Sequence, residues 1–547
     1  MMTCRIMCNL RSLGLLTLIL LSALASTLTK VQASEIDPVL SQFETLLASS
    51  NAQDRAKAIN LLAESNHPET LELLADLLDG NLYTFRGDSH LYRVARHEEG
   101  RLAERLLDDE TITIQRVRDF RRVAVNNAQR TQIRRIMALT GLNAESSTTR
   151  LQAVRQLMRD IDADTLSLIQ DAYPRETHEK VRELMAVVLA IDTLANSRNE
   201  ALQRDAIETL SASLEPRARN SLVQFSNTTD NDALKELSQR ALTQIDQKVQ
   251  FYKGLETLYF GISLGSVLVL AAIGLAITFG VMGVINMAHG ELIMIGAYTT
   301  FVVQQLMPNH IGISLFVAIP AAFVVSGLVG IAIERGVIRF LYGRPLETLL
   351  ATFGISLVLQ QAVRSIFSPL NRTVETPSWM SGMLEFNPVF AITLNRLYII
   401  FFCFIVFFAL LLILKRTALG LQVRAVSQNR AMARAMGVRS ERVDMLTFGL
   451  GSGVAGIAGV ALSQITNVGP NLGQAYIIDS FMVVVFGGVG NIWGTLVAGM
   501  TLGIATKLVE PWAGAVLAKI LVLIFIIFFI QKKPRGLFPQ RGRAAED

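Results

Sequence analysis

The sequence has little cysteine and no phosphate-loop motif, and its first half has none of the common nucleotide-binding or hydrolase motifs. Its 547 residues include three cysteines, Cys4, Cys8 and Cys403. The first two lie in an N-terminal segment with signal-peptide features, so after cleavage neither an intrachain disulfide nor a cysteine metal cluster is possible. The phosphate-loop motif GxxxxGK[ST] is missing from the whole chain, and residues 34–250 contain no GxGxxG, GxSxG or HExxH. We therefore expect no ATP hydrolysis, no cofactor, no metal site and no catalytic residue in this chain.

Charge is scarce in the second half of the chain. Residues 251–547 hold 33 of the 97 Asp, Glu, Lys and Arg residues. The net charge of +5 comes from lysine and arginine in short loops between apolar segments. That distribution indicates membrane topology rather than a phosphate-binding surface. We expect a water-soluble first half, a membrane-spanning second half and no nucleic-acid partner.

Residues 1–33 have the layout of a secretory signal peptide. Arg5 and Arg11 precede an apolar run at 13–25, and small residues at 31–33 offer a cleavage site. The run is too short to cross a bilayer comfortably, although a retained N-terminal anchor is an alternative. Cleavage would leave the next domain outside the inner membrane, in the periplasm.

Residues 34–250 have helical periodicity almost throughout, with apolar positions three and four apart. Two successive segments beginning at Arg55 and Glu69 resemble segments beginning at Arg150 and Asp164, at one common offset. Duplicated helix pairs are typical of a HEAT-like α-solenoid, which usually binds a partner on its concave surface. The one interruption, at 80–93, alternates like a short β-hairpin. The predicted fold class is nonetheless all-α: a periplasmic helical domain followed by a polytopic membrane domain at 251–547.

Eight apolar segments in the second half are long enough to span a membrane. They lie at 258–280, 287–306, 312–333, 346–366, 396–414, 444–466, 479–506 and 512–530. The basic segments 334–344, 415–442 and the C-terminal tail should be cytoplasmic by the positive-inside rule. If the chain starts outside the membrane, the crossings bring 334–344 and 415–442 to the cytoplasmic side. Eight crossings in total would, however, leave the C-terminal tail outside. We expect 479–506 to re-enter or to split at "GGVGN" (487–491), as irregular backbone does where protein or a water-filled cavity covers it.

Polar residues interrupt two of these apolar segments. Asn286, His289 and Glu291 surround Gly290 near the start of the second segment. Such groups either lie at the cytoplasmic interface, where water solvates them, or line a polar path through the bundle. Asp479 and Asn491, beside the interrupted segment 479–506, pose the same alternative. The small residues of 444–466 predict close helix packing.

Three long motifs resemble the branched-chain amino acid type of ABC-importer permeases. They are "GVINMAHGELIMIGAY", "GRPLETLLATFGISLVLQ" and "ALGLQVRAVSQNRAMARAMGV". The closing run "NVGPNLGQAYIIDSFMVVVFGGVGNIWGTLVAGM" and the helical extension are similar to urea-transporting members of that group. The resemblance implies an inner-membrane permease subunit that pairs with a second, related permease. It also implies two cytoplasmic ATPase subunits and a periplasmic substrate-binding protein as partners.

The resemblance also suggests an ATPase-coupling segment within 415–442. "AMARAMG" is similar to a degenerate Glu-Ala-Ala…Gly coupling motif. Ala431 stands at the Glu position, Met432 and Ala433 at the two Ala positions, and Gly437 at the Gly position. Because the acidic residue is missing, an ion pair at that position is not expected. The alternative is an ordinary basic cytoplasmic loop.

The resemblance favours urea as the substrate. Urea also suits the predicted path chemically, because Glu291 or Asp479 could accept hydrogen bonds from its N–H groups while Asn286 or Asn491 donates to its carbonyl. A branched-chain amino acid permease is the alternative within the same class. A membrane-anchored scaffold or sensor and a passive channel are alternatives from other classes. An anchor does not need eight spans with internal polar residues, and a channel needs no coupling loop.

Overall fold

The computed structural model describes residues 38–49, 51–65, 69–86, 90–94, 102–107, 110–114, 116–159 and 161–538. The predicted signal peptide at 1–33 lies outside these ranges. The chain divides into two compact units, each described here by itself. The first comprises Met1–Ser213 and Arg217–Ala241, and the second comprises Leu214–Pro216 and Leu242–Asp547.

The first unit is built mainly of short helices. They are α2 (Pro38–Ala48), α3 (Ala52–Ser65), α4 (Thr70–Asp79), α5 (Asn127–Leu142), α6 (Ser147–Leu157), α7 (Ala163–Ala172), α8 (Glu179–Asn196), α9 (Glu200–Ala212) and α10 (Pro216–Thr228), with 3-10 turns η1 (Val117–Asp119) and η2 (Tyr173–Arg175). Side chains define several of the helix starts: Asn126 forms a capping box with Gln129, and Asp162 accepts a hydrogen bond from the backbone N–H of Thr165.

A five-stranded antiparallel sheet lies between α4 and α5 in sequence. Its strands are β1 (Leu82–Phe85), β2 (Leu91–Arg93), β3 (Leu102–Arg105), β4 (Thr111–Thr113) and β5 (Phe120–Arg122), in the order β4-β3-β2-β1-β5. The predicted hairpin is confirmed as β1–β2, and the described chain is mostly helical, as predicted, but it also contains small sheets that the all-α class did not include. Leu82 of β1 and Leu91 of β2 are buried against the helices. The other strands have only three or four residues, which is too few for the alternation of apolar residues to be told from a helical pattern. A HEAT-like solenoid stays a prediction.

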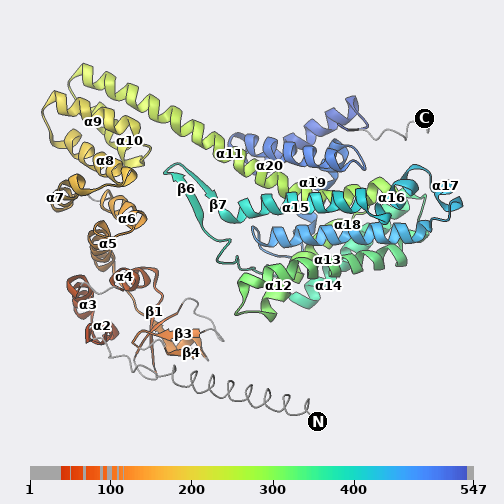
Figure 1. Ribbon diagram of the computed structural model, residues 1–547, viewed down its shortest axis with the longest axis horizontal. Coiled ribbons are helices and arrows are strands. Elements are labelled where there is room, and N and C mark those ends of the chain that lie inside the picture. Colours follow the sequence, from red (N-terminus) through yellow and green to blue (C-terminus); the bar gives the residue numbers. More distant parts are fainter. Residues whose placement is uncertain are drawn as a thin grey trace, which may run out of the picture. The chain divides into compact units, whose positions relative to one another are not determined.

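The second unit is a helical bundle with one small hairpin. Helix α11 (Asp232–Met282) begins in the first unit and continues into the second unit from Leu242. The remaining elements are α12 (His289–Leu306), α13 (Ile311–Gly336), η3 (Ile338–Phe340), α14 (Pro345–Phe367), β6 (Met383–Asn387), β7 (Phe390–Thr393), α15 (Leu394–Arg416), α16 (Ala418–Gln428), α17 (Arg430–Ala435), α18 (Ser440–Ser463), α19 (Leu472–Gly487) and α20 (Ile492–Lys532). Within this unit the β6–β7 hairpin lies at one end and α16 and α17 lie at the other, which we call the basic end (Figure 1).

Six of the described helices are long and apolar enough to cross a membrane, against the eight segments expected. They are Asp232–Met282, Ile311–Phe340, Pro345–Phe367, Leu394–Arg416, Ser440–Ser463 and Ile492–Lys532. The expected segment 287–306 is α12, whose first turn is polar. The expected segment 479–506 is split at 487–491, as predicted, but the second part is not a short half-helix. It continues into the last segment as α20, which is interrupted by the non-helical backbone of Gly514.

Small residues hold the centre of this bundle together. A Cβ atom on Gly296 of α12 would lie 2.1 Å from the carbonyl oxygen of Gly456 on α18. One on Gly459 would lie 2.0 Å from the carbonyl oxygen of Ile293. Only glycine permits backbones to approach so closely. The close packing predicted for 444–466 is therefore confirmed.

Candidate functional site

Asn286, His289 and Glu291 lie at the break between α11 and α12, and all three are at most 1% exposed. Gly283, with φ +66°, ends α11. The chain then turns back, because His289 Nε2 is 2.8 Å from the carbonyl oxygen of Ala271. Ala271 is eleven residues before the end of α11, which corresponds to about 16 Å of helix. These side chains therefore lie inside the bundle, and a role in a polar path stays a prediction.

Helix α14 supplies the partners of the buried carboxylate. Glu291 Oε1 accepts hydrogen bonds from Ser356 Oγ at 3.0 Å and from Gln360 Nε2 at 2.7 Å. Both donors belong to a buried polar stripe spaced four residues apart, which comprises Thr348, Thr352, Ser356 and Gln360. Sequence reasoning missed this stripe. Its signal was a polar residue at every fourth position of an otherwise apolar segment.

The polar stripe also binds the irregular backbone between α11 and α12. Thr352 Oγ1 accepts from the N–H of Met287 at 3.1 Å and lies 3.4 Å from the carbonyl oxygen of Ile285. Broken backbone is tolerated in a bundle only when side chains satisfy its polar groups. Three buried polar atoms still have no partner among the described residues: Asn286 Nδ2, His289 Nδ1 and Glu291 Oε2.

Two helices begin side by side at this point of the bundle. A Cβ atom on Gly290, in the first turn of α12, would lie 2.6 Å from the carbonyl oxygen of Gly473 in α19. A Cβ atom on Gly473 would lie 2.2 Å from the carbonyl oxygen of Gly290. Helix N-termini carry partial positive charge from unpaired N–H groups. The break therefore combines a buried carboxylate with two helix N-termini.

Asp479 and Asn491 do not join this cluster. Asp479 forms an ion pair with Lys519 of α20, with an N–O distance of 3.0 Å. Asn491 caps α20 by accepting from the N–H of Gly494, and its amide nitrogen lies 3.3 Å from the carbonyl oxygen of Phe538. The structure thus brings together three of the five predicted path residues. Asp479 and Asn491 instead have partners in α20 and in the C-terminal segment.

The predicted coupling segment forms the short helix α17. Asn429 caps it by accepting from the N–H of Met432, and Gly437, with φ +86°, follows its end. Ala431 and Gly437 are exposed, whereas Ala433 is buried. Met432 and Met436 are 60% and 81% exposed, so α17 presents apolar side chains to its surroundings.

Arg430 and Arg434 fix α17 to the start of α18. Arg430 bonds both carboxylate oxygens of the buried Asp444, at 2.8 and 2.9 Å. Its guanidinium carbon also lies 4.6 Å from the centroid of the Tyr342 ring. Arg434 Nε donates to Ser440 Oγ at 2.7 Å. Bidentate arginine–carboxylate pairs fix both distance and orientation, so α17 and α18 should move together.

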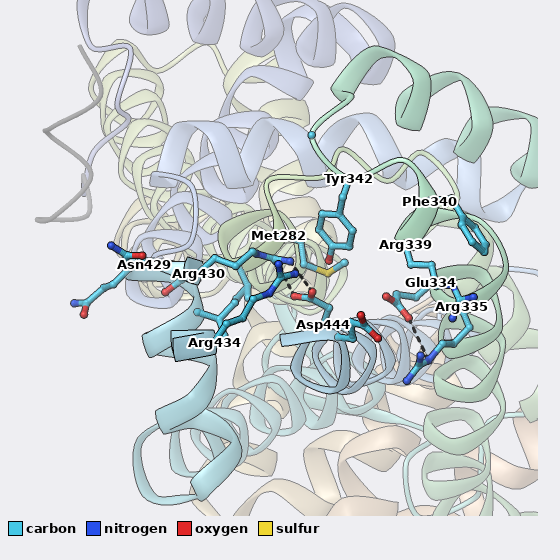
Figure 2. Close-up of a pocket in the computed structure, with 16 residues that line it drawn as sticks. Met282, Glu334, Arg335, Arg339, Phe340, Tyr342, Asn429, Arg430, Arg434 and Asp444 are labelled. Carbon is cyan, nitrogen blue, oxygen red and sulfur yellow. Dashed lines mark hydrogen bonds and ion pairs between the residues drawn. The ribbon is translucent and has the colours of Figure 1, made fainter. Parts of the chain in front are cut away.

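A cavity of ≈ 1210 Å³ opens beside these contacts, at the basic end of the bundle (Figure 2). Arginines and carboxylates from α13, η3, α17 and α18 line it, among them Glu334 and Arg335 of α13 and Arg339 of η3. Burial raises the pKa of the Tyr342 hydroxyl in its wall, so this side chain stays neutral. The cavity is polar and large enough to receive part of another protein.

Comparisons with known proteins agree on the membrane half. Residues 257–530 match the model of the family described as "Branched-chain amino acid transport system / permease component". The chain is 30% identical over 298 residues to the high-affinity branched-chain amino acid transport system permease protein BraD of Pseudomonas aeruginosa, covering 53% of this chain and 96% of that protein.

Further relatives include the LivH permease protein of Salmonella typhimurium, 31% identical over 299 residues (53% of this chain, 96% of LivH). The probable LivH of Methanocaldococcus jannaschii is 26% identical over 289 residues (50% and 88%). No solved structure matches this chain. These relatives are transporter permeases rather than enzymes, and the chain belongs to the branched-chain amino acid transport system permease family.

Proposed function

We propose that this chain is the permease subunit of an ATP-driven importer that carries branched-chain amino acids across the inner membrane. The observation that carries the proposal is the buried break at Glu291, which combines a carboxylate with two helix N-termini. An amino acid has an ammonium group that a carboxylate can bind and a carboxylate that helix N-termini favour. The substrate named for the relatives has this same pair of groups.

The ATPase subunits dock on α17 and the adjoining cavity. Apolar Met432 and Met436 provide contact area, and the arginines around the cavity provide charge complementarity. Ala431 and Gly437 are small and exposed, so α17 is narrow enough to enter a groove on the ATPase. Ala433 instead packs inward. ATP hydrolysis would then move α17, and through Arg430 and Asp444 it would move α18.

The membrane topology follows from contacts at the basic end. The backbone N–H groups of Leu537 and Phe538 donate to the carbonyls of Phe486 and Gly487, so the turn at 487–491 lies beside the basic tail. Helix α19 therefore returns to that end, and α20 leaves and comes back across Gly514. Splitting 479–506 into α19 and the first part of α20 adds one crossing. The C-terminal tail then lies on the same side of the membrane as the other two basic segments. By the positive-inside rule the basic end is cytoplasmic and residues 34–250 are periplasmic.

The other partners follow from the transport reaction. A periplasmic binding protein would deliver substrate, and a second, related permease would complete the path within membrane lipid. The helical first unit lies outside the residues matched by the family model. We propose that it binds the delivering protein or another periplasmic partner, as helical repeat surfaces do.

Urea is the second candidate substrate. It is favoured by the closing motif 467–500, by the additional N-terminal unit and by the two uncharged donors around Glu291, the hydroxyl of Ser356 and the amide of Gln360. The relatives' printed substrates favour branched-chain amino acids instead. Asp479, paired with Lys519, and Asn491, engaged as a helix cap, are less suited to bind either solute.

Uptake of labelled substrate separates these functions. Cells with the complete transporter would be compared with cells that lack this permease, using labelled leucine and labelled urea in parallel. We expect leucine uptake to depend on the chain and on its ATPase subunits. Urea uptake without leucine uptake would replace the main proposal by the second one. Uptake that persists after removal of the ATPase subunits would contradict both.

A further inference from the structure

The cavity at the basic end contains two buried carboxylates that differ in their partners. Asp444 is 1% exposed, and Arg430 bonds both of its carboxylate oxygens. Glu334 of α13 is also 1% exposed, but its Oε2 has no hydrogen-bond partner among the described residues. Burying a carboxylate oxygen without a donor is costly, so a donor from outside the chain would bind favourably here.

The arginine next to Glu334 does not supply that donor. Arg335 Nε lies 3.9 Å from Glu334 Oε2, which is beyond hydrogen-bond distance. It lies closer to Met445, with its Nε 3.3 Å from the sulfur atom. Glu334 forms part of the cavity wall (Figure 2), so an ammonium group of a ligand in the cavity could donate to its carboxylate.

Two exposed arginines in the cavity wall are available to an anionic group. Arg339 of η3 and Arg434 of α17 line the cavity, and neither forms an ion pair with another described residue. Arg434 uses its Nε to donate to Ser440, and the guanidinium carbon of Arg339 lies 4.5 Å from the centroid of the Phe340 ring. The remaining N–H groups of both arginines can donate to a carboxylate.

The cavity also has an apolar part. Val281 and Met282 at the end of α11 and Val426 of α16 line it, and Val281 packs in the same apolar cluster as Val426. A carboxylate, guanidinium groups and apolar side chains in one cavity match the ammonium group, the carboxylate and the side chain of an apolar amino acid. The cavity volume of ≈ 1210 Å³ exceeds the about 300–1,000 Å³ of small-molecule pockets, so an amino acid would fill only the part beside Glu334.

We propose that this cavity is a second amino acid site, where a branched-chain amino acid binds from the cytoplasm and lowers ATP hydrolysis by the transporter. The ammonium group of the ligand donates to Glu334, and its carboxylate accepts from Arg339 and Arg434. The ligand thereby links α17 to α13 and η3 and occupies arginines that the ATPase subunits would use. This inference rests on the proposed transport function and adds regulation by the transported product. The site is separate from the buried break, because Glu291 does not line the cavity.

ATP hydrolysis by the purified membrane complex in nanodiscs tests the site, because hydrolysis can be measured without import. The complex comprises this chain, its partner permease and the ATPase subunits, and each variant's own rate without leucine is the reference. We expect leucine to inhibit the wild type. Glu334→Gln and Arg339→Gln should each raise the half-inhibitory leucine concentration about tenfold, as expected for the loss of a hydrogen bond between charged groups.

Two control variants distinguish this site from its surroundings and from the buried break. Arg442→Gln changes an exposed arginine that does not line the cavity. Glu291→Gln changes the carboxylate that we propose for transport. Both should keep the half-inhibitory leucine concentration of the wild type. Inhibition lost in Glu291→Gln and kept in the two cavity variants would place the inhibitory site at the break and overturn the inference.

Analogues of leucine test the two charged contacts separately. Leucinamide lacks the carboxylate, and isocaproate lacks the ammonium group. Each should need an about tenfold higher concentration than leucine for the same inhibition of the wild type. Glu334→Gln should not weaken inhibition by isocaproate further, because isocaproate has no ammonium group to lose a partner. Equal inhibition by all three compounds would contradict the proposed contacts.

Other outcomes also overturn the inference. They are no inhibition of the wild type by leucine, and unchanged inhibition in both cavity variants. Loss of all ATP hydrolysis in both cavity variants would assign the cavity to ATPase binding alone. Because Arg339 is exposed, Arg339→Gln reports on the site even if Glu334→Gln misfolds. Inhibition by leucine that depends on Glu334, in a transporter that imports urea but not leucine, would contradict the proposed substrate and leave the binding site intact.

Discussion

Glu291 is a polar side chain in apolar surroundings, and its two carboxylate oxygens differ in their hydrogen bonding. Glu291 is buried, yet two neutral donors from α14 bind one of its carboxylate oxygens. Its second oxygen has no partner among the described residues. A group in that arrangement suits transient binding of a solute, since permanent solvation would need donors on both oxygens.

Replacing Glu291 should impair transport without unfolding the bundle. Glu291→Gln keeps the shape and one acceptor but removes the charge that would bind an ammonium group. We expect leucine uptake to fall about tenfold, the effect of about 1.4 kcal/mol. The matched control is Glu347→Gln at the exposed start of α14, the helix that supplies the donors to Glu291. Membrane levels by immunoblot serve as the folding measure, and unchanged uptake in Glu291→Gln would rule out a role in binding.

The ion pair of Arg150 and Glu176 makes the first unit acid-sensitive. The hydrogen bond from Arg150 lowers the pKa of Glu176 below its ordinary value of 4.5. A lowered folded-state pKa stabilises the unit above pH 4.5, and this stabilisation is lost as pH falls through the folded value. We expect protection of α6 and α8 amides from hydrogen exchange to fall in that range. Arg150→Ala should remove most of this pH dependence; the exposed ion pair Arg204–Glu200 provides the control Arg204→Ala.

At the scale of elements, close backbone contacts decide the packing of α12, α13 and α18. Gly459→Ala would place a methyl group 2.0 Å from the carbonyl oxygen of Ile293. Overpacking of this kind costs about 1–3 kcal/mol, so we expect earlier thermal aggregation in detergent. Gly254→Ala in α11, with no atom within 4 Å of the added carbon, is the control and should be neutral or stabilising. Equal melting of both variants would contradict the packing account.

The contact of α17 with α18 should transmit ATPase movement. Arg430→Gln removes the bidentate pair with Asp444. We expect the assembled transporter to hydrolyse ATP but to import several-fold less substrate per ATP, because α17 no longer moves α18 rigidly. Arg442→Gln, an exposed arginine nearby, is the control and should leave this ratio unchanged. Equal loss of hydrolysis and uptake in Arg430→Gln would instead indicate failed docking.

Element types in the membrane half were largely predictable because long apolar runs and loop charge leave few alternatives. The break at 487–491 followed from its glycines. Alternation at 80–93 revealed the β1–β2 hairpin but not β3, β4 and β5, since three- and four-residue strands are shorter than the window that periodicity needs. The partners of Glu291 and Asp479 were also missed. Ser356, Gln360 and Lys519 lie 40 to 69 residues away in the chain, and pairing at that separation requires the fold.

For the whole molecule, the account depends on which end of the bundle faces the cytoplasm. The β6–β7 hairpin and α17 lie at opposite ends (Figure 1). Met383 in β6 is 64% exposed and Met436 after α17 is 81% exposed, so a thiol at either site would be accessible. On the proposed topology, the positive-inside rule puts Met436 in the cytoplasm, where an ATPase would bind it.

Thiol labelling in intact cells tests this arrangement most directly. Met383→Cys and Met436→Cys would be made in a chain with Cys4, Cys8 and Cys403 replaced by serine, and treated with a membrane-impermeant maleimide. The account predicts labelling at position 383 in intact cells and at position 436 only after the inner membrane is permeabilised. Labelling at position 436 in intact cells would place α17 beyond the reach of any ATPase and contradict the proposed transport mechanism.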